Sequence, residues 1–149
     1  MNLSNCSMLR RYEQVRVYTP LEFERRWGVA REVAARHGCG TLVAFNPSGE
    51  GYDQWLADVR GLSCVILSQS GGPLGILRGR IAREAQSPCD VEVTHEDIVI
   101  QRDLDPVRIG ALLGTGPIAA INPGAMSANF RDLLDEIAPG IDVVDITLP

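Results

Sequence analysis

Lysine is absent from this chain, and all fourteen of its basic residues are arginine. Without lysine there is no Schiff-base nucleophile, no phosphate-loop lysine and no lysine general base. This excludes lysine-dependent aldolases, pyridoxal-phosphate enzymes of the usual kind and phosphate-loop nucleotidases that keep their usual lysine. Any anion that the protein binds must therefore be held by arginine side chains or by backbone N–H groups.

Clustered positive charge is scarce as well. The formal net charge is −5, and basic residues are adjacent only in the pairs Arg10-Arg11 and Arg25-Arg26. Nucleic-acid affinity depends on clustered cations, so this charge pattern argues against a nucleic-acid partner.

Long hydrophobic runs are also missing. The longest mostly apolar stretch, Ile109 to Ile121, is interrupted by three glycines and a proline. It falls short of the roughly 20 apolar residues that a membrane-spanning helix needs. The N-terminus shows no basic start followed by an apolar stretch, which a secretion signal would have. We therefore expect a cytoplasmic protein without a membrane partner.

Cysteine is present, but its spacing suits neither zinc binding nor redox chemistry. The four cysteines, Cys6, Cys39, Cys64 and Cys89, form no C-x-x-C pair. We expect four free thiols, with Cys64 buried inside an apolar strand. The run His95-Glu96-Asp97 has no further ligand at a recognisable spacing, so we interpret it as a solvated turn and predict no metal site.

An Asn-Pro pair follows a short apolar run twice, and this repeat is the most informative pattern in the chain. The first copy, Thr41 to Leu67, has the pattern of a strand, an Asn46-Pro47 turn, a helix and a second strand. The second copy, Pro117 to Ile146, repeats that order around Asn122-Pro123. This order is typical of a parallel α/β sheet, so we predict a right-handed parallel crossover in both copies.

The remaining sequence fits one domain over residues 1–149, with 1–12 as a flexible N-terminal segment. Alternation predicts a strand over 14–18, and a capping box at Thr19-Pro20-Leu21-Glu22 predicts a helix from Pro20. We further expect a helix over 74–85, an antiparallel hairpin near 90–101 and a short helix capped by Asp105. The predicted fold class is an α/β three-layer sandwich with a mostly parallel sheet of about five to seven strands, Rossmann-like or flavodoxin-like.

Three of the loops expected at the carboxyl ends of strands combine glycine with small hydroxyl or amide side chains. Such loops let backbone N–H groups approach a small polar or anionic ligand, and ligands of parallel α/β sheets bind at this edge. The same residue types also form turns and helix caps, so a purely structural role is the competing interpretation. The candidate ligand-binding residues are Asn46, Ser48, Gly49, Ser68, Ser70, Gly71, Gly72, Asn122, Gly124 and Ser127.

Two other function classes stay open. A non-enzymatic module would use the fold for homo-oligomerisation or protein interaction. A metal-independent serine hydrolase or transferase would use Ser68 or Ser70, but the G-x-S-x-G elbow lacks its first glycine and the only histidines are His37 and His95. No G-x-G-x-x-G fingerprint follows a strand, which disfavours nicotinamide dinucleotide binding, and the sequence identifies no cofactor.

Overall fold

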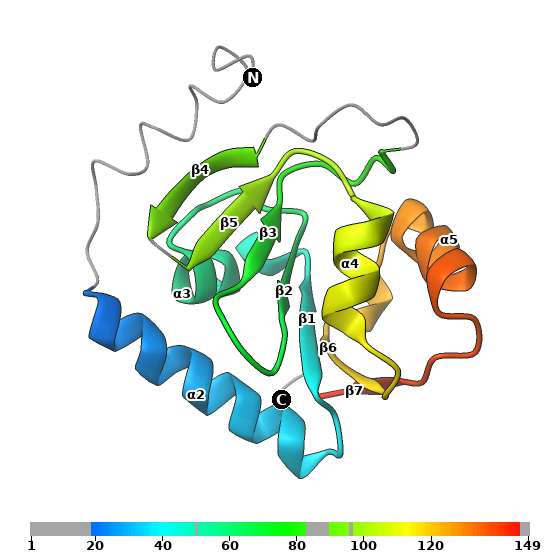
Figure 1. Cartoon of the computed structure of the whole chain (residues 1–149), viewed down its shortest axis with the longest axis horizontal. Helices are drawn as coiled ribbons and strands as arrows, with labels where there is room; N and C mark the ends of the chain where they lie inside the picture. Colours follow the sequence, from blue (N-terminus) through cyan, green and yellow to red (C-terminus); the bar gives the residue numbers. More distant parts are fainter. Residues whose placement is uncertain (1–18, 50, 83–89, 96, 147–149) are drawn as a thin grey trace.

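The structure is a computed structural model that describes residues 19–49, 51–82, 90–95 and 97–146. The strand expected over 14–18 and the flexible segment expected over 1–12 lie outside these residues. In chain order the elements are α2 (Pro20–Arg36), β1 (Thr41–Phe45), η2 (Pro47–Gly49), α3 (Tyr52–Ala57), β2 (Cys64–Leu67), β3 (Leu74–Ile76), β4 (Asp90–His95), β5 (Ile98–Gln101), α4 (Pro106–Leu113), β6 (Ile118–Ile121), η3 (Pro123–Ala125), α5 (Ala128–Ile137) and β7 (Val143–Asp145) (Figure 1).

The strands form one seven-stranded sheet in the order β4-β5-β3-β2-β1-β6-β7. Three neighbouring pairs are parallel, namely β1–β6, β3–β5 and β6–β7, and the other three are antiparallel. Following these pairs across the sheet, β2 and β4 point one way and the other strands point the opposite way. The sheet is therefore mixed, and the α/β class of the prediction is confirmed, while only three of the sheet's six strand pairs are parallel.

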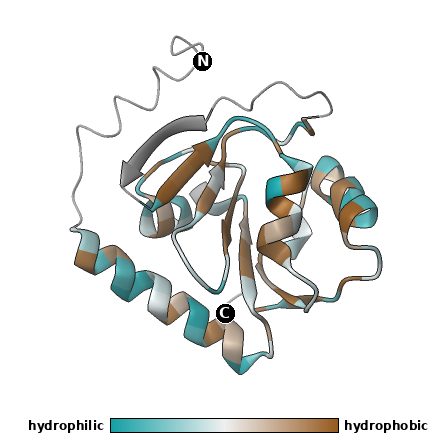
Figure 2. Cartoon of the chain, in the orientation of Figure 1, coloured by the Kyte–Doolittle hydropathy of each residue, from teal (hydrophilic) through white to brown (hydrophobic). Residues whose placement is uncertain are grey.

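Helices cover both faces of the sheet, as the three-layer prediction requires. Leu42 and Ala44 of β1 belong to one hydrophobic cluster, which α2 and α3 cover. Val43 and Phe45 belong to the other, which α4 and α5 cover. This split follows from the alternation of side chains along a strand. We refer to these two clusters as the α2-side core and the α5-side core. Figure 2 shows the hydrophobic residues of the central strands between the helices.

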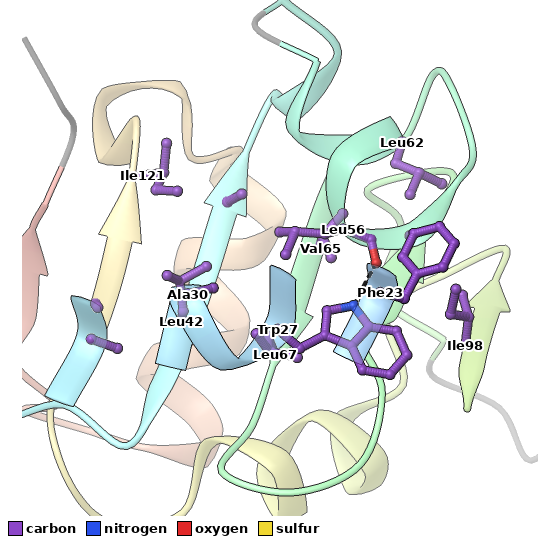
Figure 3. Close-up of a cluster of buried hydrophobic side chains, with 14 of the residues drawn as sticks. Phe23, Trp27, Ala30, Leu42, Leu56, Leu62, Val65, Leu67, Ile98 and Ile121 are labelled. Carbon is purple, nitrogen blue, oxygen red and sulfur yellow. Dashed lines mark hydrogen bonds between the residues drawn. The ribbon is translucent and has the colours of Figure 1, made fainter. Parts of the chain in front are cut away.

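Helix α2 begins and packs as its sequence predicts. The Oγ1 of Thr19 accepts a hydrogen bond from the Glu22 N–H at 3.3 Å, and Pro20 occupies the first turn. Phe23 and Trp27 are buried in the α2-side core, where the Trp27 indole N–H donates to the carbonyl of Leu56 at 2.8 Å (Figure 3). Trp27 is thus a core residue whose one polar group is satisfied. No described helix has the length and apolar character needed to cross a membrane.

The two Asn-Pro units differ in how the chain returns. In the second unit β6 and β7 are parallel, as predicted, with α5 between them. In the first unit β1 and β2 are antiparallel, so the prediction of a parallel crossover there is wrong. Helix α3 has six residues, and the chain returns from it to the end of β1, where the Asn46 N–H donates to the Ser63 carbonyl at 3.1 Å before β2 begins.

The region after β2 also differs from expectation. Residues 74–76 form strand β3, antiparallel to β2, where a helix over 74–85 was predicted. Gly75 explains the difference, because a Cβ there would lie 2.7 Å from the side chains of both Leu62 and Ile100. The glycine thus permits close packing in a buried strand. The antiparallel hairpin near 90–101 is confirmed by the β4–β5 pair, and Asp105 caps α4 as predicted.

Candidate functional site

The two Asn-Pro turns lie next to each other at one edge of the sheet. Strands β1 and β6 are parallel neighbours with Ala44 paired to Ile121, so Asn46 and Asn122 follow at the same carboxyl edge. Both asparagines have left-handed backbone, with φ of 44° and 55°. Asparagine tolerates this region better than most residues, and the proline that follows each one opens a short 3-10 turn.

The chain leaves these two strands toward opposite faces of the sheet. After β1 it forms α3, whose Leu56 packs in the α2-side core. After β6 it forms α5, whose Phe130 and Leu133 pack in the α5-side core. Adjacent parallel strands whose connections diverge in this way form a topological switch point, where open α/β sheets place their ligands.

A cavity of about 270 Å³ lies at this edge, on the α5 side. Its lining combines the polar residues Asn46, Ser63, Cys64 and Ser127 with apolar residues that include Phe45 of β1 and Phe130 of α5. None of the described residues that line it carries a charge. They are Phe45, Asn46, Ser63, Cys64, Gly79, Leu104, Ala125, Ser127 and Phe130.

The start of α5 borders the cavity through Ser127 and Phe130. The Ser127 Oγ accepts a hydrogen bond from the Phe130 N–H at 3.1 Å, and the Ser127 carbonyl accepts one from Arg131 at 3.1 Å. The N–H groups of Ala128 and Asn129, at the start of the helix, have no intrahelical partner. Together with the helix dipole they favour an anion or a carbonyl oxygen at this position.

Cys64 is a potential nucleophile in the lining of this cavity, but its thiol is held protonated. Burial raises its pKa to about 12, although a hydrogen bond with Ser63 partly opposes that shift. A thiol that stays protonated at neutral pH is a poor nucleophile. Cys64 and Cys39 are both free thiols, as predicted, while Cys6 and Cys89 lie outside the described residues.

The loop Ser68–Gly72 does not join this site, which corrects the prediction of three converging loops. Strand β2 runs antiparallel to β1, so its carboxyl end lies at the opposite edge of the sheet. There the guanidinium of Arg31 donates to the carbonyls of Ser68, at 2.8 Å, and Gly71. Partial burial lowers the pKa of Arg31. The Ser68 hydroxyl donates to the Ser70 carbonyl at 2.9 Å. These bonds fix the loop conformation.

Ser68 and Ser70 line a separate polar cavity of about 510 Å³, together with Thr41 and the turn from Gly114 to Pro117. His37 is not among its lining residues. The side chain of His95 lies outside the described part of the chain. Nothing in this cavity therefore supports a serine-histidine pair.

The predicted glycines have different roles: two shape the loop after β2, and two lie at the carboxyl edge of β1 and β6. A Cβ on Gly72 would overlap the carbonyl of Asp97, so this glycine is required by packing. Gly71 has φ of 79° and serves the turn. Gly49 and Gly124 follow the two asparagines at the carboxyl edge, and a Cβ on Gly124 would meet no atom within 4 Å. The side chain of Ser48 lies outside the described part of the chain.

Sequence reasoning missed Ser63, Cys64 and Gly79 as residues of this edge. Ser63 lies there because β2 runs back from the end of β1, and its carbonyl accepts the Asn46 N–H at 3.1 Å. Within the described residues no group of three or more histidine, cysteine, aspartate or glutamate side chains is arranged to hold a metal ion.

No protein-family model matches the sequence, and neither does any curated protein. The fold is similar to that of a proline dipeptidase from Streptococcus agalactiae, with a TM-score of 0.53, 10% identity, and coverage of 83% of this chain and 94% of that one. It is also similar to the creatinase/prolidase N-terminal domain of an X-Pro dipeptidase from Streptococcus pyogenes, with a TM-score of 0.50, 14% identity, and coverage of 82% and 99%.

A third similar structure is the Xaa-Pro dipeptidase from Bacillus anthracis, with a TM-score of 0.50 and 10% identity. The match covers 84% of this chain but 34% of that one. At these identities the likeness concerns the fold alone. The chain has a mixed α/β fold of the kind found in the N-terminal domains of Xaa-Pro peptidases.

Proposed function

We propose that this protein binds a small polar or anionic ligand in the cavity at the carboxyl edge of β1 and β6. The observation that carries the proposal is the switch point, because the connections after these parallel neighbours diverge and a cavity of about 270 Å³ lies beside them. Ligands of open α/β sheets occupy this position as a rule. Of the predicted site residues, Asn46 and Ser127 line this cavity and support the role.

Size and charge narrow the ligand class. The cavity is slightly below the range of about 300–1,000 Å³ typical of drug-sized ligands, so it fits one small group such as a phosphate or a carboxylate. No described lining residue is charged, so the backbone N–H groups of α5 would hold the anion. Arg78 and Arg80, both exposed, flank Gly79 at the cavity and attract anions toward it.

A thermal-shift titration with inorganic phosphate, sulfate, sugar phosphates and dicarboxylates tests this function. A ligand at a hundredfold excess over its Kd should stabilise the protein by about 2.7 kcal/mol. The substitution Gly79→Val should abolish the ligand-induced shift while changing the free protein little. Its Cβ has room, because the nearest atom, the Ser127 Oγ, is 3.5 Å away, and its methyl groups would fill the cavity.

Gly116→Ala is the matched control, because Gly116 lines the polar cavity at the opposite edge and a Cβ there meets no atom within 4 Å. This variant should keep the full ligand response. If Gly116→Ala loses the ligand-induced thermal shift and Gly79→Val keeps it, the ligand binds in the polar cavity at the opposite edge of the sheet, and the proposal is wrong. The absence of any stabilising compound would favour the second candidate function.

That second candidate is a non-enzymatic interaction domain, which packs against another polypeptide such as the catalytic part of a peptidase. It is supported by the likeness to an isolated N-terminal domain over 99% of that domain's chain, and to 34% of a longer Xaa-Pro dipeptidase. Sedimentation velocity over a range of concentrations tests one form of this role, homo-oligomerisation. A monomer at every concentration would exclude that form.

A further inference from the structure

The edge strand β7 presents backbone groups that no neighbouring strand of the described sheet uses. β7 is the last strand in the sheet order and pairs only with β6. The Ile118 N–H donates to the Asp142 carbonyl and the Ile146 N–H donates to the Ala120 carbonyl, both at 2.9 Å. In a parallel ladder this pattern turns the N–H and C=O of Val143 away from β6. The edge can therefore accept another strand.

A cavity lies beside this edge on the α5 side of the sheet. It has a volume of about 350 Å³ and is lined by Val143, Ile141 and Leu134, among others. Successive side chains of a strand point to opposite faces, so a strand added at β7 would direct every second side chain toward the face that carries this cavity.

The charge of this region identifies the chemistry of the partner. Residues 128–146 contain five carboxylates, Asp132, Asp135, Glu136, Asp142 and Asp145, against one arginine, Arg131. This is a net charge of −4 out of −5 for the whole chain. Asp142 and Asp145 are exposed at the two ends of the edge strand. Pairing two copies of β7 would bring like charges together, whereas a basic segment would be attracted.

We propose that the β7 edge is a docking site for an extended basic segment of a partner polypeptide. The segment adds a strand beside Val143 through main-chain hydrogen bonds. An apolar side chain of the segment enters the cavity beside Val143, and a flanking arginine or lysine meets Asp142. Main-chain bonds that give affinity and side-chain pockets that give specificity are the features of strand addition. This site is separate from the proposed ligand cavity.

The test uses a fluorescein-labelled peptide, Gly-Arg-Arg-Val-Leu-Arg-Arg-Gly, and measures binding to the full chain by fluorescence anisotropy. Val143→Pro removes the outward N–H and leaves the bonds to β6 in place, because that N–H does not face β6. We expect affinity to fall at least about tenfold in Val143→Pro and to stay within about twofold in Val143→Thr, which keeps the N–H and the side-chain volume. Circular dichroism of both variants checks that they are folded.

Three further measurements bear on the proposal. The peptide Gly-Glu-Glu-Val-Leu-Glu-Glu-Gly should bind more weakly, and Gly79→Val should bind the basic peptide as the parent does, even if the ligand proposal fails. Equal affinity for parent and folded Val143→Pro would overturn the proposal, because it would show charge attraction without strand pairing. A concentration-dependent dimer that Val143→Pro dissociates would also overturn it, since the edge would then belong to a second copy.

Discussion

The two Asn-Pro units share a turn and differ in the path that follows it. Each strand ends at an asparagine with positive φ, and each proline opens a 3-10 turn. After α3, with six residues, the chain returns antiparallel in β2, and after α5, with ten, it returns parallel in β7. The turn motif therefore sets local backbone geometry, but it does not set the direction of the next strand.

This difference also creates the candidate site. Because α3 and α5 cover opposite faces, the two similar turns diverge above one crevice. Because β2 is antiparallel, Ser63 and Cys64 lie at the same edge as Asn46 and help to line the cavity there. Two identical crossovers on one face would have left β1 and β6 without a switch point.

The largest effect is expected from the contact that joins the two units. Phe130 of α5 is 2% exposed, and its ring packs edge-on against Phe45 of β1, with centroids 5.0 Å apart. Phe130→Ala should lower the free energy of unfolding by about 3–5 kcal/mol, since it leaves a cavity in the α5-side core. Urea denaturation measures the change.

A double-mutant cycle with Phe45→Ala then isolates the contact between the rings. Their coupling should be about 0.5–1.5 kcal/mol, the range for edge-to-face pairs. If the losses in free energy of unfolding caused by the two substitutions are additive, the two rings are not coupled, and the two units pack independently.

The next largest loss of stability is expected at Asp53, which contacts the loop between α3 and β2. The second unit has no equivalent of this contact. Asp53 is 1% exposed, and its carboxylate accepts the N–H groups of Gln54 at 2.8 Å and Gly61 at 2.7 Å. These bonds tie α3 to the loop that leads back into β2. Asp53→Ala should cost about 1.5–3 kcal/mol in urea denaturation, because it leaves buried N–H groups without a charged acceptor.

Asn129 provides the matched control, since it lies as far after Asn122 as Asp53 lies after Asn46. It is exposed on the first turn of α5, so Asn129→Ala should change stability by no more than about 0.5 kcal/mol. Similar costs at both positions would mean that the returning loop of the first unit does not depend on Asp53.

The parts of the fold that depend on neighbouring residues could be predicted from the sequence. The Thr19 cap, the Asp105 cap and the hairpin near 90–101 are all local patterns, and the structure contains them. Strand direction was not predictable in the same way, because it depends on contacts between residues far apart in the sequence. Of the three loops predicted to converge, the two asparagine turns lie at one edge of the sheet. The loop at Ser68 lies at the opposite edge because β2 runs antiparallel to β1.

The smallest expected effect tests whether the two turns are equivalent. At positive φ a residue with a Cβ is strained, by about 1–2 kcal/mol for most residues and less for asparagine, whereas glycine is not. Asn46→Ala and Asn122→Ala should therefore each cost about 1 kcal/mol, and the glycine variants of the same positions should be close to neutral. Thermal and urea denaturation of the four variants measure these changes. If one alanine variant costs nothing while the other is destabilised, only one turn requires left-handed backbone in solution, and the equivalence of the two turns is refuted. Equal costs would instead support it, and the cause of the difference in strand direction would then lie outside the two turns.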